Sequence, residues 1–346
     1  MRDGGGAGDL HHRTHLDATA RGAVGQPGLP AAEAVFVINF RYHVVSLTAV
    51  FLALAVGLVL GTAALNGTVQ NQINEQVSGL RNSNGQLRDQ VEELQTRAAS
   101  QDQFVQQIAP GLLAGRLTAR SVLLVSGPTA DSDDTTQVVK MIKLAGGTVT
   151  GQVRLKKDFT DPNKEDALQD LAARITPAGV TNLPNNGVGV ETASALLATV
   201  LLATKAQITD LNRTQILAGY EGLGVLDLDG EVSKTLPTAV VVVSGAPETG
   251  TDAADRNKAF LNVVKQFDAV AAQMVLAAPT AAGAGNPVAS VRDDGTLAKT
   301  ISTVDGVSLA EGQVAAAMAL AEQFTGRAGH YGTGSGASAR IPTLRS

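Results

Sequence analysis

One uncharged stretch constrains this chain more than any other feature of its sequence. Residues 44–65, VVSLTAVFLALAVGLVLGTAAL, are 22 consecutive positions without Asp, Glu, Lys or Arg. As a helix rising about 1.5 Å per residue, the stretch is about 33 Å long and can cross a hydrocarbon core of about 30 Å. We therefore expect a membrane anchor in residues 37–65, with the chain beyond Leu65 outside the cytoplasm.

The same stretch has two interpretations, a retained anchor or an export signal that is removed. A signal has an apolar region of about 7–15 residues before a cleavage site of small residues. This run is longer, although Gly61-Thr62-Ala63 also fits such a site. Arg41 precedes the span and the next basic residue is Arg81, a bias that places the N-terminus inside. The sequence favours a single-pass cell-membrane protein.

The 36 residues before the anchor differ from everything after them. They are rich in Gly and polar residues and have no periodic apolar face, which predicts a disordered extension. His11, His12 and His15 are close enough in sequence to bind a labile metal, but an unstructured cluster explains them as well. Translation in the native protein could also begin at Val37, which would remove the extension altogether.

Two patterns favour a parallel homodimer. Within the span, Ala53, Gly57 and Gly61 recur every fourth residue, a spacing that lets two helices approach closely but also arises by chance in Ala-rich and Gly-rich spans. Over residues 66–109, apolar residues alternate at spacings of four and three, as in a coiled-coil stalk. The seam consists of Val77, Leu80, Asn84, Leu87, Val91 and Leu94.

The heptad positions of this seam define the expected dimer more closely. With Val77 at position a, Val occupies a and Leu occupies d, which favours two parallel strands, and Asn84 at a sets the register. Arg97 at g and Asp102 at the following e are spaced to pair between chains. The alternative is one amphipathic helix packed on its own domain. Pro110, followed by Gly111, is expected to end the helix.

Residues 110–326 are predicted to form an extracytoplasmic α/β domain, because short apolar segments alternate with helical patterns. The fold class we predict is a Rossmann-like, mostly parallel, three-layer α/β domain, followed by a Gly-rich tail over residues 327–346 in which His330 and Tyr331 belong to a docking loop. The expected strands are 121–126, 148–155, 224–228, 238–244, 273–278 and 300–304. The expected helices are 133–145, 161–175, 191–205, 210–219, 255–270 and 309–324.

Composition excludes several kinds of function. A net charge of -5 gives no reason to expect nucleic acid as a partner. Without cysteine the chain has no disulfide, no thiolate metal site and no thiol nucleophile. Only His43 and His330 lie outside the N-terminal extension, so a Ser-His-Asp arrangement cannot be argued. We expect no enzyme activity and no cofactor.

The acidic turn after the first strand is a second candidate metal site. Asp131, Asp133 and Asp134 lie where α/β sheets bind ligands, and their carboxylates could hold a hard cation such as Mg²⁺. Capping of the next helix and complementation of its dipole explain the same residues. The sequence favours capping.

The chain resembles the actinobacterial copper transport protein B family. The resemblance is carried by FRYHVVSLTAVFLALAVGLVLGT before the coiled coil, by SVLLVSGP, and by ISTVDGVSLAEGQVAAAMALAEQFTGRAGHYG near the end. It runs from about Val37 to Gly332 and implies an actinobacterial envelope protein of copper efflux or copper homeostasis, described in mycobacteria as an outer-membrane channel. Copper is implied by this resemblance alone, since copper(I) prefers thiolate and thioether ligands.

Two further functions remain open from the residues themselves. A membrane-tethered, dimerised α/β domain is suited to work as a non-catalytic envelope scaffold that binds partner proteins. A Rossmann-like domain is also found in enzymes that bind nucleotides or sugars, although fold does not imply function.

Overall fold

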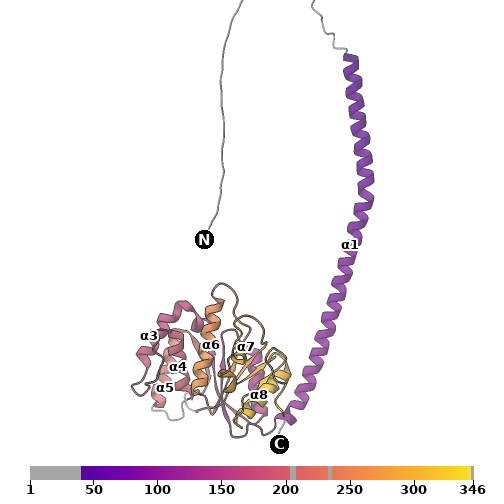
Figure 1. The fold of residues 1–346 in the computed structure, drawn as a ribbon. Helices are drawn as coiled ribbons and strands as arrows, with labels where there is room; N and C mark the ends of the chain where they lie inside the picture. The colour runs from indigo at the N-terminus through magenta and orange to yellow at the C-terminus, as the bar shows by residue number, and fades with distance from the viewer. Residues whose placement is uncertain (1–39, 203–207, 233–235, 344–346) are drawn as a thin grey trace, which may run out of the picture. The chain divides into compact units, whose positions relative to one another are not determined.

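The computed structural model describes residues 40–202, 208–232 and 236–343, and of residues 64–70 the backbone only (Figure 1). The predicted extension 1–36, with its three histidines, lies outside the described residues. Contacts divide the chain into two units, Met1–Gly85 and Gln86–Ser346. They are described one at a time, although helix α1, Phe40–Leu113, contributes to both.

The first unit contains the apolar part of α1. The segment Phe40–Ala63 has a mean hydropathy of 2.5 over its most apolar window and is the one described helix long and apolar enough to cross a membrane. Threonine hydroxyls inside it bond to the preceding turn, with Thr48 Oγ1 donating to Val44 O at 2.7 Å. Nothing lies within 4 Å of a Cβ built on Gly57 or Gly61. The small-residue face is therefore uncovered, and its role in dimerisation stays a prediction.

The predicted seam is uncovered as well. Leu80, Leu87 and Leu94 are between 61% and 70% exposed, and Asn84 is exposed. Most of the surface of these side chains is therefore left open to solvent. The helix that carries them is confirmed; a second strand for a coiled coil is not tested by a single chain.

A seven-stranded sheet forms the centre of the second unit, in the order β3-β2-β1-β4-β5-β6-β7. Neighbouring strands run parallel except β2 and β3, which are antiparallel. The mostly parallel sheet predicted from the sequence is confirmed. The strands are β1 Ser121–Ser126, β2 Thr148–Leu155, β3 Leu226–Gly230, β4 Ala239–Val243, β5 Met274–Ala278, β6 Ile301–Asp305 and β7 His330–Tyr331.

Helices alternate with these strands, largely as expected. They are α2 Ser132–Leu144, α3 Glu165–Ile175, α4 Gly189–Leu202, α5 Asp210–Leu223, α6 Ala253–Val270, α7 Pro287–Asp293 and α8 Ala310–Gln323, with 3-10 turns η1 Lys157–Thr160, η2 Pro162–Lys164 and η3 Leu297–Lys299. The expected helix start at Asp161 is wrong: Asp161 instead accepts from Asn163 N, and Pro162 opens a separate turn. The expected helix end at Lys205 lies outside the described residues.

Hydrophobic cores lie on both faces of the sheet. Alternate residues of β4 point to opposite faces, so Val240 and Val242 join α3, α4 and α6, while Val241 and Val243 join α2 and α8. All five residues of β4 are buried. This arrangement explains why β4 is apolar at every position, as expected of a strand covered on both sides.

The last turns of α1 belong to the core shared with α2 and α8. Ala109 and Leu113 of α1, and Leu117 in the turn after it, are each 0% exposed in that core. The expected end of the helix at Pro110 is therefore wrong, since α1 continues to Leu113 with Pro110 inside it. Packing of Leu113 stabilises the last turn despite the N–H that Pro110 lacks. The chain turns at Gly115, whose φ of 74° is accessible to glycine.

Candidate functional site

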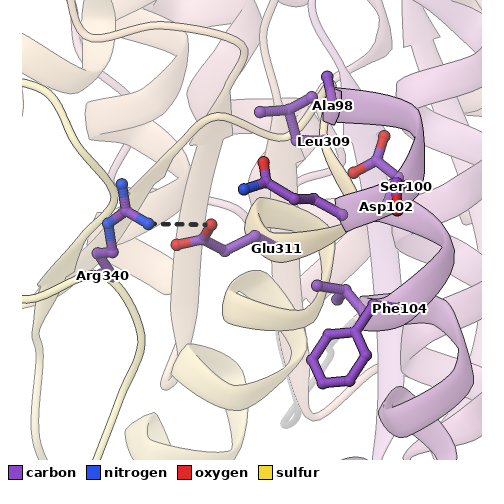
Figure 2. Close-up of a pocket in the computed structure, with 9 residues that line it drawn as sticks. Ala98, Ser100, Asp102, Phe104, Leu309, Glu311 and Arg340 are labelled. Carbon is purple, nitrogen blue, oxygen red and sulfur yellow. Dashed lines mark ion pairs between the residues drawn. The ribbon is translucent and has the colours of Figure 1, made fainter. Parts of the chain in front are cut away.

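A groove of about 480 Å³ lies between α1 and the N-terminus of α8 in the second unit (Figure 2). Residues of α1 line one side, and the start of α8 together with the C-terminal segment lines the other. The lining residues are Ala98, Ser100, Gln101, Asp102, Phe104, Val105, Leu309, Glu311 and Arg340.

Asp102 connects the two sides of the groove. Its Oδ1 accepts a hydrogen bond from Ala310 N at 2.9 Å, across 208 residues of sequence. The residue at the N-cap position of α8 is Leu309, which makes no side-chain cap bond. A carboxylate at a helix N-terminus satisfies a free N–H and complements the helix dipole. Asp102 of α1 thus caps α8 in place of a residue of its own turn.

The rim of the groove carries both charged and apolar side chains. Glu311 and Arg340 form an ion pair at 3.6 Å, drawn as the dashed line in Figure 2, with side chains 39% and 69% exposed. Such an exposed pair contributes little to stability. Phe104 is 62% exposed and Leu309 48% exposed. The groove therefore offers an uncovered aromatic ring, an aliphatic side chain and charges of both signs.

The heptad seam of α1 runs into this groove. Ala98 and Val105 continue the a positions, and Gln101 continues the d positions. Ala98 and Val105 are half-buried, whereas Leu94, one turn earlier, is 64% exposed. Sequence reasoning missed the contribution of α8 because no local signal connects residues more than 200 positions apart.

The acidic turn acts as a helix cap. Asp131 Oδ1 accepts from Asp133 N at 2.7 Å and from Asp134 N at 3.3 Å, at the start of α2. Asp134 accepts from Ser308 Oγ at 2.8 Å. Desolvation raises the pKa of Asp134, and the charges of Asp131 and Asp133 raise it further, against the Ser308 hydrogen bond. Among the described residues, no group of three or more His, Asp or Glu side chains could hold a metal ion.

The sheet has a topological switch point between β1 and β4, where folds of this kind bind ligands. The cavity there is only about 20 Å³, close to the size needed for one water molecule. Phe260, 7% exposed, covers Gly127 so closely that a Cβ on that glycine would lie 2.6 Å from the ring. The crevice is thus filled by a side chain of α6.

The Gly-rich segment after α8 docks at the edge of the sheet on a buried ion pair between α7 and β6. Arg292 Nη1 lies 2.8 Å from Asp305 Oδ2, with side chains 2% and 3% exposed. Asp305 Oδ1 accepts from Thr333 N and Gly334 N. A Cβ on Gly332, whose φ is 124°, would lie 2.3 Å from the Asp305 carboxyl carbon. The glycines therefore allow the backbone to approach a buried carboxylate.

His330 belongs to this docked segment. Its Nδ1 lies 2.8 Å from Thr303 Oγ1. Burial lowers the pKa of His330, and the nearby charge of Arg292 lowers it further. Both effects favour the neutral imidazole, which suits a side chain that bonds to a strand of the sheet.

Comparison with known proteins identifies the family. A family model described as "Copper transport outer membrane protein, MctB" matches residues 37–342. The chain belongs to the MctB family. The resemblance seen from residue 37 onward is therefore confirmed, and the one apolar helix of this length among the described residues, Phe40–Ala63, fits a single-pass membrane protein of this family.

Curated members of the MctB family align over most of their length. A protein of Mycobacterium tuberculosis (strain ATCC 25618 / H37Rv) named "Copper transporter MctB" is 32% identical over 314 residues, which cover 87% of this chain and 98% of that protein. A protein of Mycobacterium leprae (strain TN) with the same name is 30% identical over 317 residues, with the same shares.

Proposed function

We propose that this chain acts in copper homeostasis in the cell envelope, with copper as the cargo of the system it serves. Membership of the MctB family over residues 37–342 supports the role. The apolar segment Phe40–Ala63 supports a membrane anchor, and the charge bias around it favours a domain on the extracytoplasmic side.

The side chains of this chain favour a role in organising an assembly over direct binding of copper. Copper(I) prefers thiolate and thioether ligands. The chain has no cysteine, and Met141, Met274 and Met318 are at most 3% exposed inside the hydrophobic cores. These thioethers serve as core side chains. We therefore assign the passage of copper to an assembly that this chain helps to build.

We further propose that the chain is a dimeric, non-catalytic scaffold, and the exposed seam of α1 is the observation that carries this role. Leu80, Leu87 and Leu94 lie on one side of the helix, since they occupy the d positions. They are more than 60% exposed. A row of large apolar side chains left in water marks an interaction surface. Val at a and Leu at d favour a parallel pair of such helices, with Asn84 fixing the register.

The filled crevice of the sheet favours a scaffold over the alternative of a Rossmann-like enzyme for nucleotides or sugars. A cavity of about 20 Å³ takes one water molecule, whereas pockets for such ligands are about 300–1,000 Å³. Phe260 packs in the hydrophobic core, so opening the crevice would cost the burial of an aromatic ring.

Copper content tests the role in homeostasis. A strain that lacks the gene should accumulate copper, and the wild-type chain should restore the normal content. Leu87→Asp combined with Leu94→Asp should fail to restore it, because charges in the seam oppose helix pairing. Thr96→Asp, at position f outside the seam, is the matched control and should restore it. Unchanged copper in the deletion strain would overturn the role.

Disulfide formation tests the dimer directly, because the natural chain has no cysteine. Leu94→Cys places a thiol at a d position, where two parallel helices in register bring the thiols together. Mild oxidation of the full chain in its membrane should yield a covalent dimer. Thr96→Cys should yield none. Equal dimer yields from the two variants would argue against the seam.

A further inference from the structure

We propose that the groove between α1 and α8 receives helix α1 of a second copy of this chain, so that the dimer interface extends from the stalk into the α/β domain. The inference rests on the proposed dimer. It adds a specific surface. Helix α1 of the second copy packs against the start of α8 of the first copy, as well as against α1 of the first copy.

The continuity of the seam leads to this surface. Two parallel helices paired at Leu87, Val91 and Leu94 keep their a and d positions face to face as long as the heptads continue. The next positions, Ala98 and Gln101, line the groove. A second helix that remains in register therefore lies along the mouth of the groove, against α1 and the start of α8. The small side chain at Ala98 leaves room for it.

The environment of α1 changes along its length in the way that such a surface requires. From Val77 to Leu94, the a and d side chains face solvent. From Ala109 on, the helix packs in the core of its own domain. Between these two parts, Val105 is half-buried against the core of its own domain, and beside it lies an open groove that Asp102 spans by accepting one hydrogen bond from Ala310 N.

The charges and apolar side chains of the groove match the flank of a second α1. In a parallel pair, position g of one helix faces the following e of the other. Arg97 of the second copy would face Asp102, which lines the groove together with Glu311 and its ion-pair partner Arg340. Phe104 of the second copy, 62% exposed at position g, would cover Leu309, which is 48% exposed.

A mixed crosslinking experiment tests the proposal in the full chain. Two differently tagged chains are expressed together, one carrying Phe104→Cys and the other Leu309→Cys, and are treated in the membrane with a short bismaleimide. A crosslink between the two tags can form only between copies. The control pair combines Thr96→Cys with Leu309→Cys, because position f points away from the partner. We expect a crosslink in the first pair and none in the control.

The outcomes separate this inference from the dimer on which it rests. If Leu94→Cys forms disulfide dimers but the Phe104→Cys and Leu309→Cys pair does not crosslink, the groove proposal is overturned and the dimer stands. If both fail, the dimer is overturned as well. Equal crosslinking of the test and control pairs would reflect random collisions and also overturn the groove proposal.

A charge reversal provides a second measurement without new thiols. Arg97→Glu should raise the dissociation constant of the full-chain dimer in detergent roughly fivefold, because two symmetric and partly exposed pairs with Asp102 turn repulsive. Arg88→Glu is the matched control, since its partner position g is Ser83. An equal effect of the two reversals would contradict a specific contact of Arg97.

Discussion

Two parts of α1 carry the same kind of apolar spacing and meet opposite environments. Between Val77 and Leu94 the apolar side chains are 37% to 70% exposed, whereas Ala109 and Leu113 are 0% exposed in the core of the α/β domain. Both parts are helical because both have an apolar face that repeats with the helical period. The comparison teaches that a periodic pattern predicts a face to be buried without saying what will bury it.

The stretch between the two parts combines features of both. Ala98 and Val105 are half-buried, and Asp102 caps α8. A side chain that the heptad places on the edge of a coiled coil thus also serves the fold of its own domain. The seam side of α1 therefore passes from exposed at Leu94 to half-buried at Ala98 and Val105.

The largest expected effect is the loss of stability when a buried ion pair of the α/β domain is broken, compared with an exposed ion pair of α1. Arg292→Met removes one partner of the buried Arg292–Asp305 pair and should lower the free energy of unfolding by about 4 kcal/mol, because Asp305 is left charged and buried. Glu93→Gln breaks the exposed Arg97–Glu93 pair of α1, with side chains 70% and 61% exposed, and should cost at most about 0.5 kcal/mol. Guanidinium unfolding of the full chain in detergent measures both.

A matched pair of leucines tests the same contrast within one helix. Leu113→Ala should lower the free energy of unfolding of the domain by about 3 kcal/mol, since it leaves a cavity in the core. Leu87→Ala should change that quantity by less than about 0.5 kcal/mol and should weaken dimerisation instead. Equal losses of domain stability from the two substitutions would mean that both parts of α1 pack on the domain.

The cap at the groove should have an intermediate effect. Asp102→Ala removes the acceptor for Ala310 N and should destabilise the domain by about 1 kcal/mol. Asp102→Asn should retain most of the stability, because asparagine caps helices nearly as well. Asp89→Ala, on an exposed position of the same helix, is the control. A loss for the asparagine variant as large as that for alanine would refute the cap.

The smallest expected effect is a pH dependence of the stability that arises at Asp134, in the first turn of α2 and hydrogen-bonded to Ser308. Desolvation raises the pKa of Asp134, so its neutral form is favoured in the folded state. Stability should fall as pH rises from the ordinary carboxyl pKa of about 3.9 through the raised value. Asp134→Asn should remove this fall, seen as a melting temperature above that of the wild type at neutral pH and equal to it in acid.

Loss of the hydroxyl that bonds to Asp134 should act in the opposite direction. Ser308→Ala removes the hydrogen bond that lowers this pKa, so the fall in stability with pH should extend to higher pH. Melting curves of the wild type and the two variants from acid to neutral pH compare all three. Identical curves for the three proteins would contradict a raised pKa at Asp134.

Local patterns in the sequence were sufficient for most of the sheet. The segments 121–126 and 148–155 coincide with β1 and β2, because apolar runs bounded by turn residues are signals contained in a few neighbouring residues. Asp131 was correctly favoured as a cap for the same reason. β7 was missed, since a strand of two residues depends on its pairing with β6, and α7 was missed although Asn286 before Pro287 is a typical helix start.

By itself the sequence determined the apolar helix at the start, the heptad seam and the alternation of strands and helices, since each is a periodicity along the chain. The tertiary structure decided three further points. It extended α1 beyond Pro110 by burying Leu113, it filled the crevice of the sheet with Phe260, and it brought Asp102 to the start of α8. Each depends on residues far apart in sequence, whose contact is set by packing of the whole domain and by no local propensity.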